Sequence, residues 1–314
     1  MIVGLVLLAT GAEALVRGAT GLALRLGISA LTIGLTVVAI GTGSPELVLS
    51  IQAALAGNSD IALGNVVGSN ISNTALVLGV AALVRPMAVR SQLVRREMPL
   101  MIGVTVLLML MLIDGSLGRI DGLVLVVGGM IYLVGTYVVA QKGDTKEAVE
   151  EFEEAVEEIC EDQEKSPRRG WLDGLLLAVG LGALLAGASL LLKGAVFVAA
   201  EVGLSEVVIG LTVIALGTSL PELAASVAAA RRGEADVAFG NVIGSNIFNI
   251  LLVLGISAMI QPFQATGLRP LDLATLLGSA VLLLVLMWRG WVLSRTEGAL
   301  LLVGYAAYIY SLLG

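Results

Sequence analysis

Two short segments place a carboxylate in the middle of an apolar stretch that is long enough to cross a membrane. Residues 41–46 read Gly-Thr-Gly-Ser-Pro-Glu, and residues 217–222 read Gly-Thr-Ser-Leu-Pro-Glu. Burying a charge at the centre of a bilayer costs about 2.5–3.5 kcal/mol on insertion scales. Acids at such positions are therefore rare and usually functional. Glu46 and Glu222 are the first candidate site residues, and the fold must shield both of them from lipid.

The composition indicates a protein that crosses the membrane many times. Of its 314 residues, 57% are hydrophobic and 14% are charged, whereas soluble domains have about 45–50% and about 25%. Ten segments have roughly the 20 residues that a membrane helix needs. The predicted fold class is an all-α integral membrane protein, whose immediate partner is the lipid bilayer and for which no nucleic-acid partner is expected. The ten predicted spans are residues 2–24, 29–55, 60–83, 98–114, 120–140, 172–199, 205–230, 236–261, 270–288 and 297–313.

The chain contains an internal repeat. Residues 31–80 align without a gap with residues 207–256, and more than half of the aligned residues are identical. Each half has five predicted spans, an odd number, so the halves cross the membrane in opposite directions. We therefore expect two inverted five-helix repeats, residues 1–141 and 171–314, with broken helices at the centre. Such inverted repeats are typical of secondary transporters, whose ion site lies near the midplane between them.

Basic residues predict the orientation of the chain. If the N-terminus is outside, the inward-facing segments hold nearly all the Lys and Arg residues, and the outward loops hold only Arg119 and Arg269. Positive residues concentrate on the cytoplasmic side of membrane proteins. Both termini are therefore expected outside the plasma membrane and the polar linker, residues 142–170, inside. Within that linker, residues 147–164 are expected to form a short amphipathic helix, and Cys160 should stay reduced. The inward-facing basic residues are Arg25, Arg85, Arg90, Arg95, Arg96, Lys142, Lys146, Lys165, Arg168, Arg169, Arg231, Arg232, Arg289 and Arg295.

The same oxygen-bearing side chains recur around each acid. Thr and Glu stand four residues apart in both segments, and so do a Ser and an Asn further along, which places each pair on one helix face. Gly and Pro at the break free backbone carbonyls to face inward. The chain has no His and a single Cys, so the predicted site is one for hard cations bound by oxygen. The recurring residues are Thr42, Ser69 and Asn73 in the first half, and Thr218, Ser245 and Asn249 in the second.

These residues also have a purely structural interpretation. A single Ser or Thr in a membrane helix usually bonds its own backbone, and a single Asn usually joins two helices. Recurrence of the whole set at matched positions of two inverted halves favours a cation site instead. No nucleophile–base pair recurs in both halves, so no enzymatic activity is predicted, and no cofactor is expected beyond the transported ions.

The two motifs resemble a known family. Gly-Thr-x-x-Pro-Glu, followed by Gly-Asn-Val-Val-Gly-Ser-Asn-Ile-x-Asn or its Val-Ile variant, is similar to the repeats of sodium/calcium exchangers in the cation/calcium antiporter superfamily, of the prokaryotic type without a large regulatory loop. The resemblance implies Na⁺/Ca²⁺ antiport by alternating access, in which the first and sixth helices slide across a core of the other eight. It implies that Glu46 and Glu222 bind both ions and that Asn73 and Asn249 lie nearest the centre. The flanking sodium ligands that it implies are Thr42, Thr218, Ser69, Ser245 and Ser219, with backbone oxygens near Ala39 and Ala215.

The chain departs from the family pattern in two places. The first motif has Gly43-Ser44 where Ser-Leu is expected, so the hydroxyl at residue 43 is missing. Asn249 stands where potassium-dependent relatives carry Asp, and we therefore expect exchange that needs no K⁺. An antiporter driven by protons or carrying another divalent ion is the alternative of the same class, and a cation channel is the alternative of another class. A channel ring usually comes from several subunits, whereas this site is expected to form within a single chain.

Overall fold

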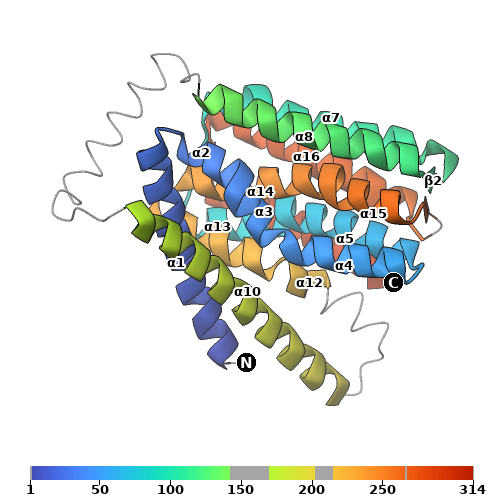
Figure 1. Ribbon diagram of the computed structural model, residues 1–314, viewed down its shortest axis with the longest axis horizontal. Helices are drawn as coiled ribbons and strands as arrows, with labels where there is room; N and C mark the ends of the chain where they lie inside the picture. Colours follow the sequence, from blue (N-terminus) through green and yellow to red (C-terminus); the bar gives the residue numbers. More distant parts are fainter. Residues whose placement is uncertain (1, 142–169, 202–214, 266, 314) are drawn as a thin grey trace.

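The computed structural model describes residues 2–141, 170–201, 215–265 and 267–313. Within these residues the protein is almost entirely helical (Figure 1). The predicted linker helix at residues 147–164 and Cys160 lie outside the described residues, as do residues 207–214 at the start of the aligned segment 207–256.

The first repeat contains the five predicted spans, three of them built from several helical pieces. The second and third spans change from α-helix to a wider π-helical turn and back, a local distortion that is frequent at functional sites. The pieces are α1 (Ile2–Leu26); α2 (Ala30–Ile33), η1 (Gly34–Val38), α3 (Ala39–Thr42) and α4 (Ser44–Leu55); α5 (Ser59–Ile71), η2 (Ser72–Val77) and α6 (Leu78–Val84); η3 (Leu93–Glu97), α7 (Met98–Met111) and η4 (Leu112–Asp114); and α8 (Arg119–Gln141).

The second repeat follows the same plan, with a π-helical turn at the same place in its third span. Its pieces are α10 (Gly170–Glu201); α12 (Ala215–Thr218) and α13 (Leu220–Arg232); α14 (Ala235–Phe248), η6 (Asn249–Leu254) and α15 (Gly255–Ile260); α16 (Pro270–Gly290); and α17 (Arg295–Leu313).

The predicted spans agree with the helices except at one start. In the described residues, seven helical stretches are apolar and long enough to cross a membrane, and eight are if the bent pair Ala30–Thr42 and Ser44–Leu55 forms one span. The other two predicted spans correspond to α12–α13, which follows the undescribed residues 202–214, and to α17. The fourth span begins at Leu93, not at residue 98 as predicted, because the helix continues through Arg95-Arg96-Glu97. Long basic side chains at a helix end can reach the membrane surface and need not end the helix.

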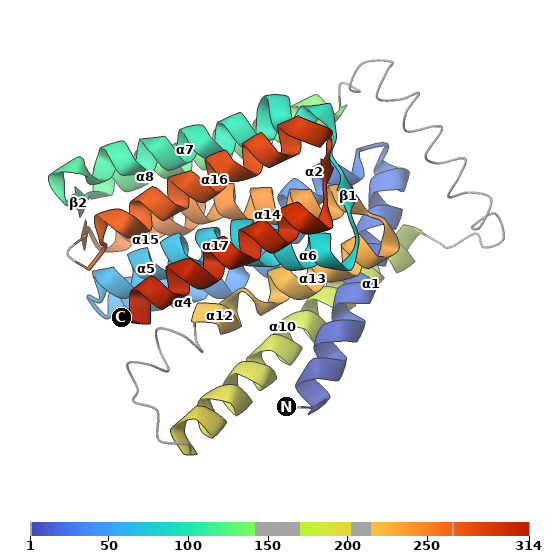
Figure 2. The ribbon, with the colours of Figure 1, turned by 180° about the vertical axis from the view of Figure 1, so that it is seen from behind.

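Two small sheets demonstrate the inverted symmetry. Strand β1 (Met87–Ala88) pairs with β4 (Val292–Leu293), and β2 (Ser116–Leu117) pairs with β3 (Phe263–Gln264). Adding 176 to the residue numbers of β1 and β2 gives those of β3 and β4, and the paired residues correspond in the same way. Each sheet joins one repeat to the other, and the two sheets lie at opposite ends of the bundle (Figure 2).

Close glycine contacts repeat the same symmetry. A Cβ added to Gly79 of α6 would lie 3.0 Å from the backbone oxygen of Gly298 in α17. A Cβ on Gly255 of α15 would lie equally close to the oxygen of Gly122 in α8. The last helix of each repeat therefore packs against the third span of the other repeat. The chain thus has the predicted fold, two inverted repeats, and the repeats interlock.

The helices α1 and α10 form a separate pair. They run side by side along one face of the bundle and extend beyond it (Figures 1 and 2). Small residues allow this close approach, since a Cβ on Gly18 would lie 2.4 Å from the Leu177 backbone nitrogen. An ion pair between Arg25 and Asp173 joins the two helices at one end.

A polar contact at the end of α13 links the α1–α10 pair to the rest of the bundle. The Glu13 carboxylate of α1 accepts a hydrogen bond from Arg17 one turn away at 2.9 Å. It also accepts a bond of 2.6 Å from the Arg232 guanidinium at the end of α13.

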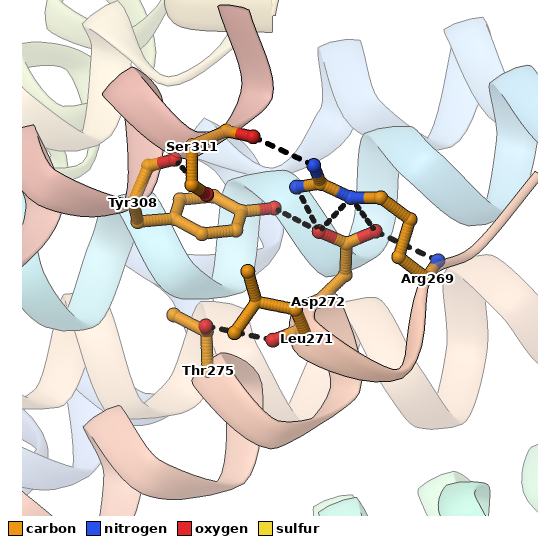
Figure 3. Close-up of polar contacts among 6 residues, drawn as sticks. All are labelled: Arg269, Leu271, Asp272, Thr275, Tyr308 and Ser311. Carbon is orange, nitrogen blue, oxygen red and sulfur yellow. Dashed lines mark hydrogen bonds and ion pairs between the residues drawn. The ribbon is translucent and has the colours of Figure 1, made fainter. Parts of the chain in front are cut away.

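The opposite end of the bundle has its own polar network, at the start of α16 (Figure 3). The Arg269 guanidinium forms an ion pair of 2.8 Å with Asp272 and donates to the Ser311 backbone oxygen at 2.7 Å. The Tyr308 hydroxyl donates to the same aspartate at 3.2 Å. The bond from Arg269 gives a hydrogen-bond donor to a backbone carbonyl at the end of α17, where carbonyls have no partner within the helix. It also neutralises one of the two basic residues on the predicted outer side.

The two third spans lie at the centre of the molecule. The stretches Asp60–Val84 and Ala235–Ile260 are the most deeply buried apolar helices in the described part of the chain, whereas α8 and α10 mainly face outward. These two central stretches carry both copies of the Gly-Asn motif.

Candidate functional site

Both acids stand directly after a break in the second span of their repeat. The break lies at Gly43 in the first repeat and at Ser219 in the second, with nearly equal backbone angles of φ −77°, ψ 2° and φ −85°, ψ 4°. The first break bends the span by 45°. A proline in the first turn of the next helix fits this geometry because it needs no backbone donor there. The breaks thus place Glu46 and Glu222 in the first turn of α4 and α13, where the helix dipole favours negative charge.

The two carboxyl groups are fully buried and unsatisfied. Glu46 and Glu222 are 0% and 1% exposed, and none of their four carboxylate oxygens has a hydrogen bond of normal geometry within the described residues. The Ser69 hydroxyl lies beside the Glu46 carboxylate and the Thr42 hydroxyl beside that of Glu222, and the two acids are near enough to interact. A buried charge without a partner is very costly, so these carboxyl groups must either take up protons or be balanced by a bound cation.

The amides of Asn73 and Asn249 are oriented with a free oxygen. The Asn73 nitrogen Nδ2 donates to Oδ1 of Asn246 at 3.2 Å, and Nδ2 of Asn249 donates to Oδ1 of Asn70 at 3.0 Å. The Oδ1 atoms of Asn73 and Asn249 are buried and accept no hydrogen bond from the described residues. Each amide is therefore held by the opposite repeat in the orientation that suits a cation ligand.

A second pair of asparagines supports the acidic turns. The Asn65 amide donates to the backbone oxygen of Glu46 at 3.3 Å and to the Ser50 hydroxyl at 3.0 Å. Asn241 makes the equivalent bonds in the second repeat, to the oxygen of Glu222 at 3.2 Å and to a serine of α13 at 2.9 Å. Each asparagine thereby ties the turn that carries its acid to a central helix.

The sequence analysis missed four of these asparagines as site residues: Asn65, Asn70, Asn241 and Asn246. A signal for them was present, because all four belong to the repeated motif and recur at the same offset as the acids.

The predicted hydroxyl ligands lie at the site but differ in their hydrogen bonds. The Thr42 hydroxyl bonds Oδ1 of Asn241 at 2.9 Å, and the Ser245 hydroxyl lies 3.4 Å from the backbone oxygen of Ala39. The hydroxyls of Ser69 and Ser219 are buried and have no partner among the described residues. A hydroxyl that donates its proton keeps its oxygen lone pairs for a cation.

The remaining predicted ligands, Thr218 and Ala215, occupy the positions in the second repeat that match Thr42 and Ala39 in the first. Thr218 is buried just before the second break. Ala215 is the first residue of α12 and stands where Ala39 begins α3.

The donor set suits hard cations. No group of three or more His, Cys, Asp or Glu residues gathers anywhere in the described part of the chain. The site instead combines two carboxylates with amide, hydroxyl and backbone oxygens. Such neutral and charged oxygens are the ligands that Ca²⁺ takes, six to eight at a time.

Comparisons with known proteins find a matching family model and similar proteins along nearly the whole chain. The family model described as "Sodium/calcium exchanger protein" matches residues 1–139 and 173–314. A relative named "Putative antiporter CaxA" from Alkalimonas amylolytica is 42% identical, over 99% of this chain and 97% of its own length. The "Sodium/calcium exchanger MaX1" of Methanosarcina acetivorans is 33% identical, over 98% and 96%. Solved structures of the sodium-calcium exchanger NCX_Mj superpose with a TM-score of 0.84 at 33% identity, and cover 99% of this chain and 97% of that one.

Proposed function

The chain belongs to the sodium/calcium exchanger protein family, as an antiporter that exchanges Na⁺ for Ca²⁺, and we propose that both ions bind between Glu46 and Glu222. The observation that carries this proposal is the set of buried, unpartnered oxygens: four from the two carboxylates and one each from Asn73 and Asn249. They come from both repeats and converge where the broken helices meet the central ones. A cation is the group that satisfies all of them together.

Charge explains how one site serves two kinds of ion. Two carboxylates carry −2, which balances one Ca²⁺ or two Na⁺. Because both ions use the same carboxylates, they compete, and the downhill movement of one then drives the uphill movement of the other. We propose that Thr42, Thr218, Ser69, Ser245 and Ser219, with the backbone oxygens of Ala39 and Ala215, complete the ligand set, and that one chain suffices because its own repeats close the site.

Access to the site is proposed to depend on the α1–α10 pair. The two helices pack tightly against each other through glycines but run along the outside of the bundle. A rigid pair at the edge of a fixed site can move as a unit, as in other inverted-repeat transporters. We propose that this movement exposes the site to one side of the membrane at a time. No enzymatic activity is proposed.

Flux measurements in proteoliposomes test the function. Radiolabelled Ca²⁺ should accumulate when a Na⁺ gradient is imposed, and it should saturate with Ca²⁺ concentration. Accumulation under a proton gradient alone would favour the proton-driven alternative. Ca²⁺ entry that needs no counter-ion and does not saturate would favour a channel and contradict antiport.

We predict that exchange needs no K⁺. With Asn at both residue 73 and residue 249, the centre carries only two negative charges, which the transported ions already balance. Replacing K⁺ with choline should leave Na⁺-driven Ca²⁺ flux unchanged. In Asn249→Asp, a third carboxylate would favour an additional cation or a proton, so flux should persist and become more sensitive to pH and K⁺. Loss of flux in the unmodified protein without K⁺ would contradict this view of the centre.

We also predict the orientation from the Lys and Arg distribution. A cysteine at Asn58, which is exposed between α4 and α5, should react with a membrane-impermeant thiol reagent added to intact cells. Native Cys160 serves as the internal control and should react only after permeabilisation. The reverse pattern would place the termini and the linker on the opposite sides.

A further inference from the structure

The α1–α10 pair is not centred between the two repeats. Helices α4 and α13 are equivalent, since each follows a break and carries one of the central acids, but they run to opposite ends of the bundle (Figure 1). Both α1 and α10 pack against α13, whereas neither makes an extensive contact with α4 within the described residues. The pair therefore covers the half of the bundle along α13, which we call the α13 side, and not the equivalent half along α4, the α4 side.

An apolar contact holds the pair in this place. Leu8 of α1 and two residues of α10, Ala188 and Leu191, form a small buried cluster that packs against Leu220 and Ala224 of α13. Apolar contacts of this kind are not directional. They depend only on apolar side chains that lie at suitable places on the facing helices.

The other repeat can make much of the same apolar contact. The residues that correspond to Leu8, Ala188 and Leu191 are Leu184, Ala12 and Leu15, and Val48 of α4 corresponds to Ala224. The Val48 side chain is 53% exposed, so this position on α4 is open in the present conformation. The apolar contact alone therefore gives the pair little reason to prefer α13 over α4.

An ion pair at the last residue of α13 is the second contact. The Arg232 guanidinium lies 2.6 Å from Oε1 of Glu13 in α1, and Arg17 donates to the same oxygen at 2.9 Å. The side chains of Glu13 and Arg232 are 38% and 27% exposed, so water screens their attraction only in part. A carboxylate of the α1–α10 pair is thereby held by a cation of the surrounding bundle.

This ion pair has no counterpart in the other repeat. The residues that correspond to Glu13, Arg17 and Arg232 are Ser189, Lys193 and Ala56. If the repeats exchanged their conformations, Ser189 of α10 would approach Ala56, at which α4 ends. A hydroxyl would then face a methyl group, and no ion pair could form between them.

We propose that the Glu13–Arg232 ion pair is a latch that favours the conformation closed on the α13 side over the one closed on the α4 side. This inference rests on the movement of the α1–α10 pair proposed above and adds a bias to it. The apolar contact can form in both conformations, whereas the ion pair can form in only one. The latch makes the two sides of the membrane unequal, because ions arriving from the α13 side must bind the less populated conformation.

Cross-linking tests the latch without measuring transport. Cysteines at Ala56 and Ser189, in a Cys160→Ser background, report the exchanged conformation, because their counterparts Arg232 and Glu13 meet in the present one. Glu13→Gln removes the ion pair and keeps the shape of the side chain. A short bifunctional thiol reagent should then join the two cysteines about two- to fivefold faster, since ion pairs at partly exposed sites shift an equilibrium by about that factor.

Three further variants separate the latch from a general effect of charge. Arg232→Gln should act as Glu13→Gln does, and the double variant should act no more strongly than either single one, because the pair can be broken only once. Arg231→Gln is the matched control. It removes the same charge from the same helix end, but its exposed side chain takes no part in the Glu13 contact, so the cross-linking rate should not change.

A second latch can be built into the other repeat. Ser189→Glu together with Ala56→Arg creates the missing ion pair, with Lys193 in the place of Arg17. In membrane vesicles of known orientation, this variant and Glu13→Gln should both shift the Ca²⁺ concentration for half-maximal exchange. That concentration should fall about two- to fivefold on the α13 side and rise on the α4 side.

The outcomes distinguish this inference from the proposed function. If Glu13→Gln changes cross-linking no more than Arg231→Gln does, in variants whose unfolding temperature shows that they fold, the ion pair is not a latch, although antiport stands. Failure of the two cysteines to cross-link in every variant would contradict the movement itself. If the unmodified protein shows no Na⁺-coupled flux, the proposed function fails.

Discussion

Glu46→Gln and Glu222→Gln are each expected to abolish Na⁺-driven Ca²⁺ exchange while the protein remains folded. Either substitution keeps the shape of the side chain and leaves the site with −1 in place of −2. Two unit charges 4 Å apart interact by about 4 kcal/mol at an effective dielectric constant of 20. For a divalent ion the loss is larger, so Ca²⁺ affinity should fall by roughly a thousandfold or more.

The measurement is Ca²⁺ uptake into proteoliposomes under an imposed Na⁺ gradient, with the unfolding temperature without ions as the test of folding. That temperature should not fall, because the substitution removes an unpaired buried charge. Glu297→Gln is the matched control, since Glu297 is also an acid in the first turn of a helix but bonds Ser294. Near-normal exchange by both central variants would show that the ions bind elsewhere.

Asn246→Ala is expected to have the next largest effect. Its amide donates to the Thr74 hydroxyl at 2.8 Å and accepts from Asn73 at 3.2 Å. Removing it frees the Asn73 amide to rotate and leaves buried polar groups unpaired, at about 1–3 kcal/mol each. We expect Ca²⁺ affinity to fall at least tenfold and the protein to become less stable. Asn70→Ala should act in the same way through Asn249, with which it shares a bond of 3.0 Å.

Two measurements separate the effect of Asn246→Ala on Ca²⁺ affinity from its effect on stability. The first is the Ca²⁺ concentration for half-maximal exchange, and the second is the unfolding temperature without ions. Asn58→Ala is the control, because this residue is exposed and makes no capping bond. If Asn246→Ala loses stability but keeps its Ca²⁺ affinity, the asparagine supports the fold without orienting the ligand.

The sequence predicted the parts of this site that lie within one repeat. The apolar lengths, the Gly and Pro breaks and the recurrence of Glu46 as Glu222 required no knowledge of how the repeats face each other. The bonds from Asn73 to Asn246 and from Asn249 to Asn70 do require it, because each partner comes from the other repeat. A single asparagine in a membrane helix has many possible partners, and spacing within its own helix cannot select one.

The spacing of residues in the sequence did not predict the π-helical turns either. Spacing of four placed Ser69 and Asn73 on one helix face, but η2 begins at Ser72, so Asn73 lies in the wider turn. The pairing of Phe248 with Gly43 was missed for a related reason. The missing hydroxyl was visible in the sequence, whereas the ring that fills its place comes from α14.

The interlocking of the repeats has a consequence for how the protein is made. The chain is synthesised from its N-terminus, so Asn73 enters the ribosomal tunnel 176 residues before its counterpart, Asn249. At about 5–20 residues per second, the interval is on the order of ten to thirty seconds. During that time β1 has no β4 to pair with and Asn70 has no Asn246 to bond. Until the second half is made, the polar groups of the first half must therefore be satisfied by water or by the insertion machinery. A ribosome that stops early would therefore leave a five-helix fragment in which strand β1 and Asn70 have no partners from the second repeat.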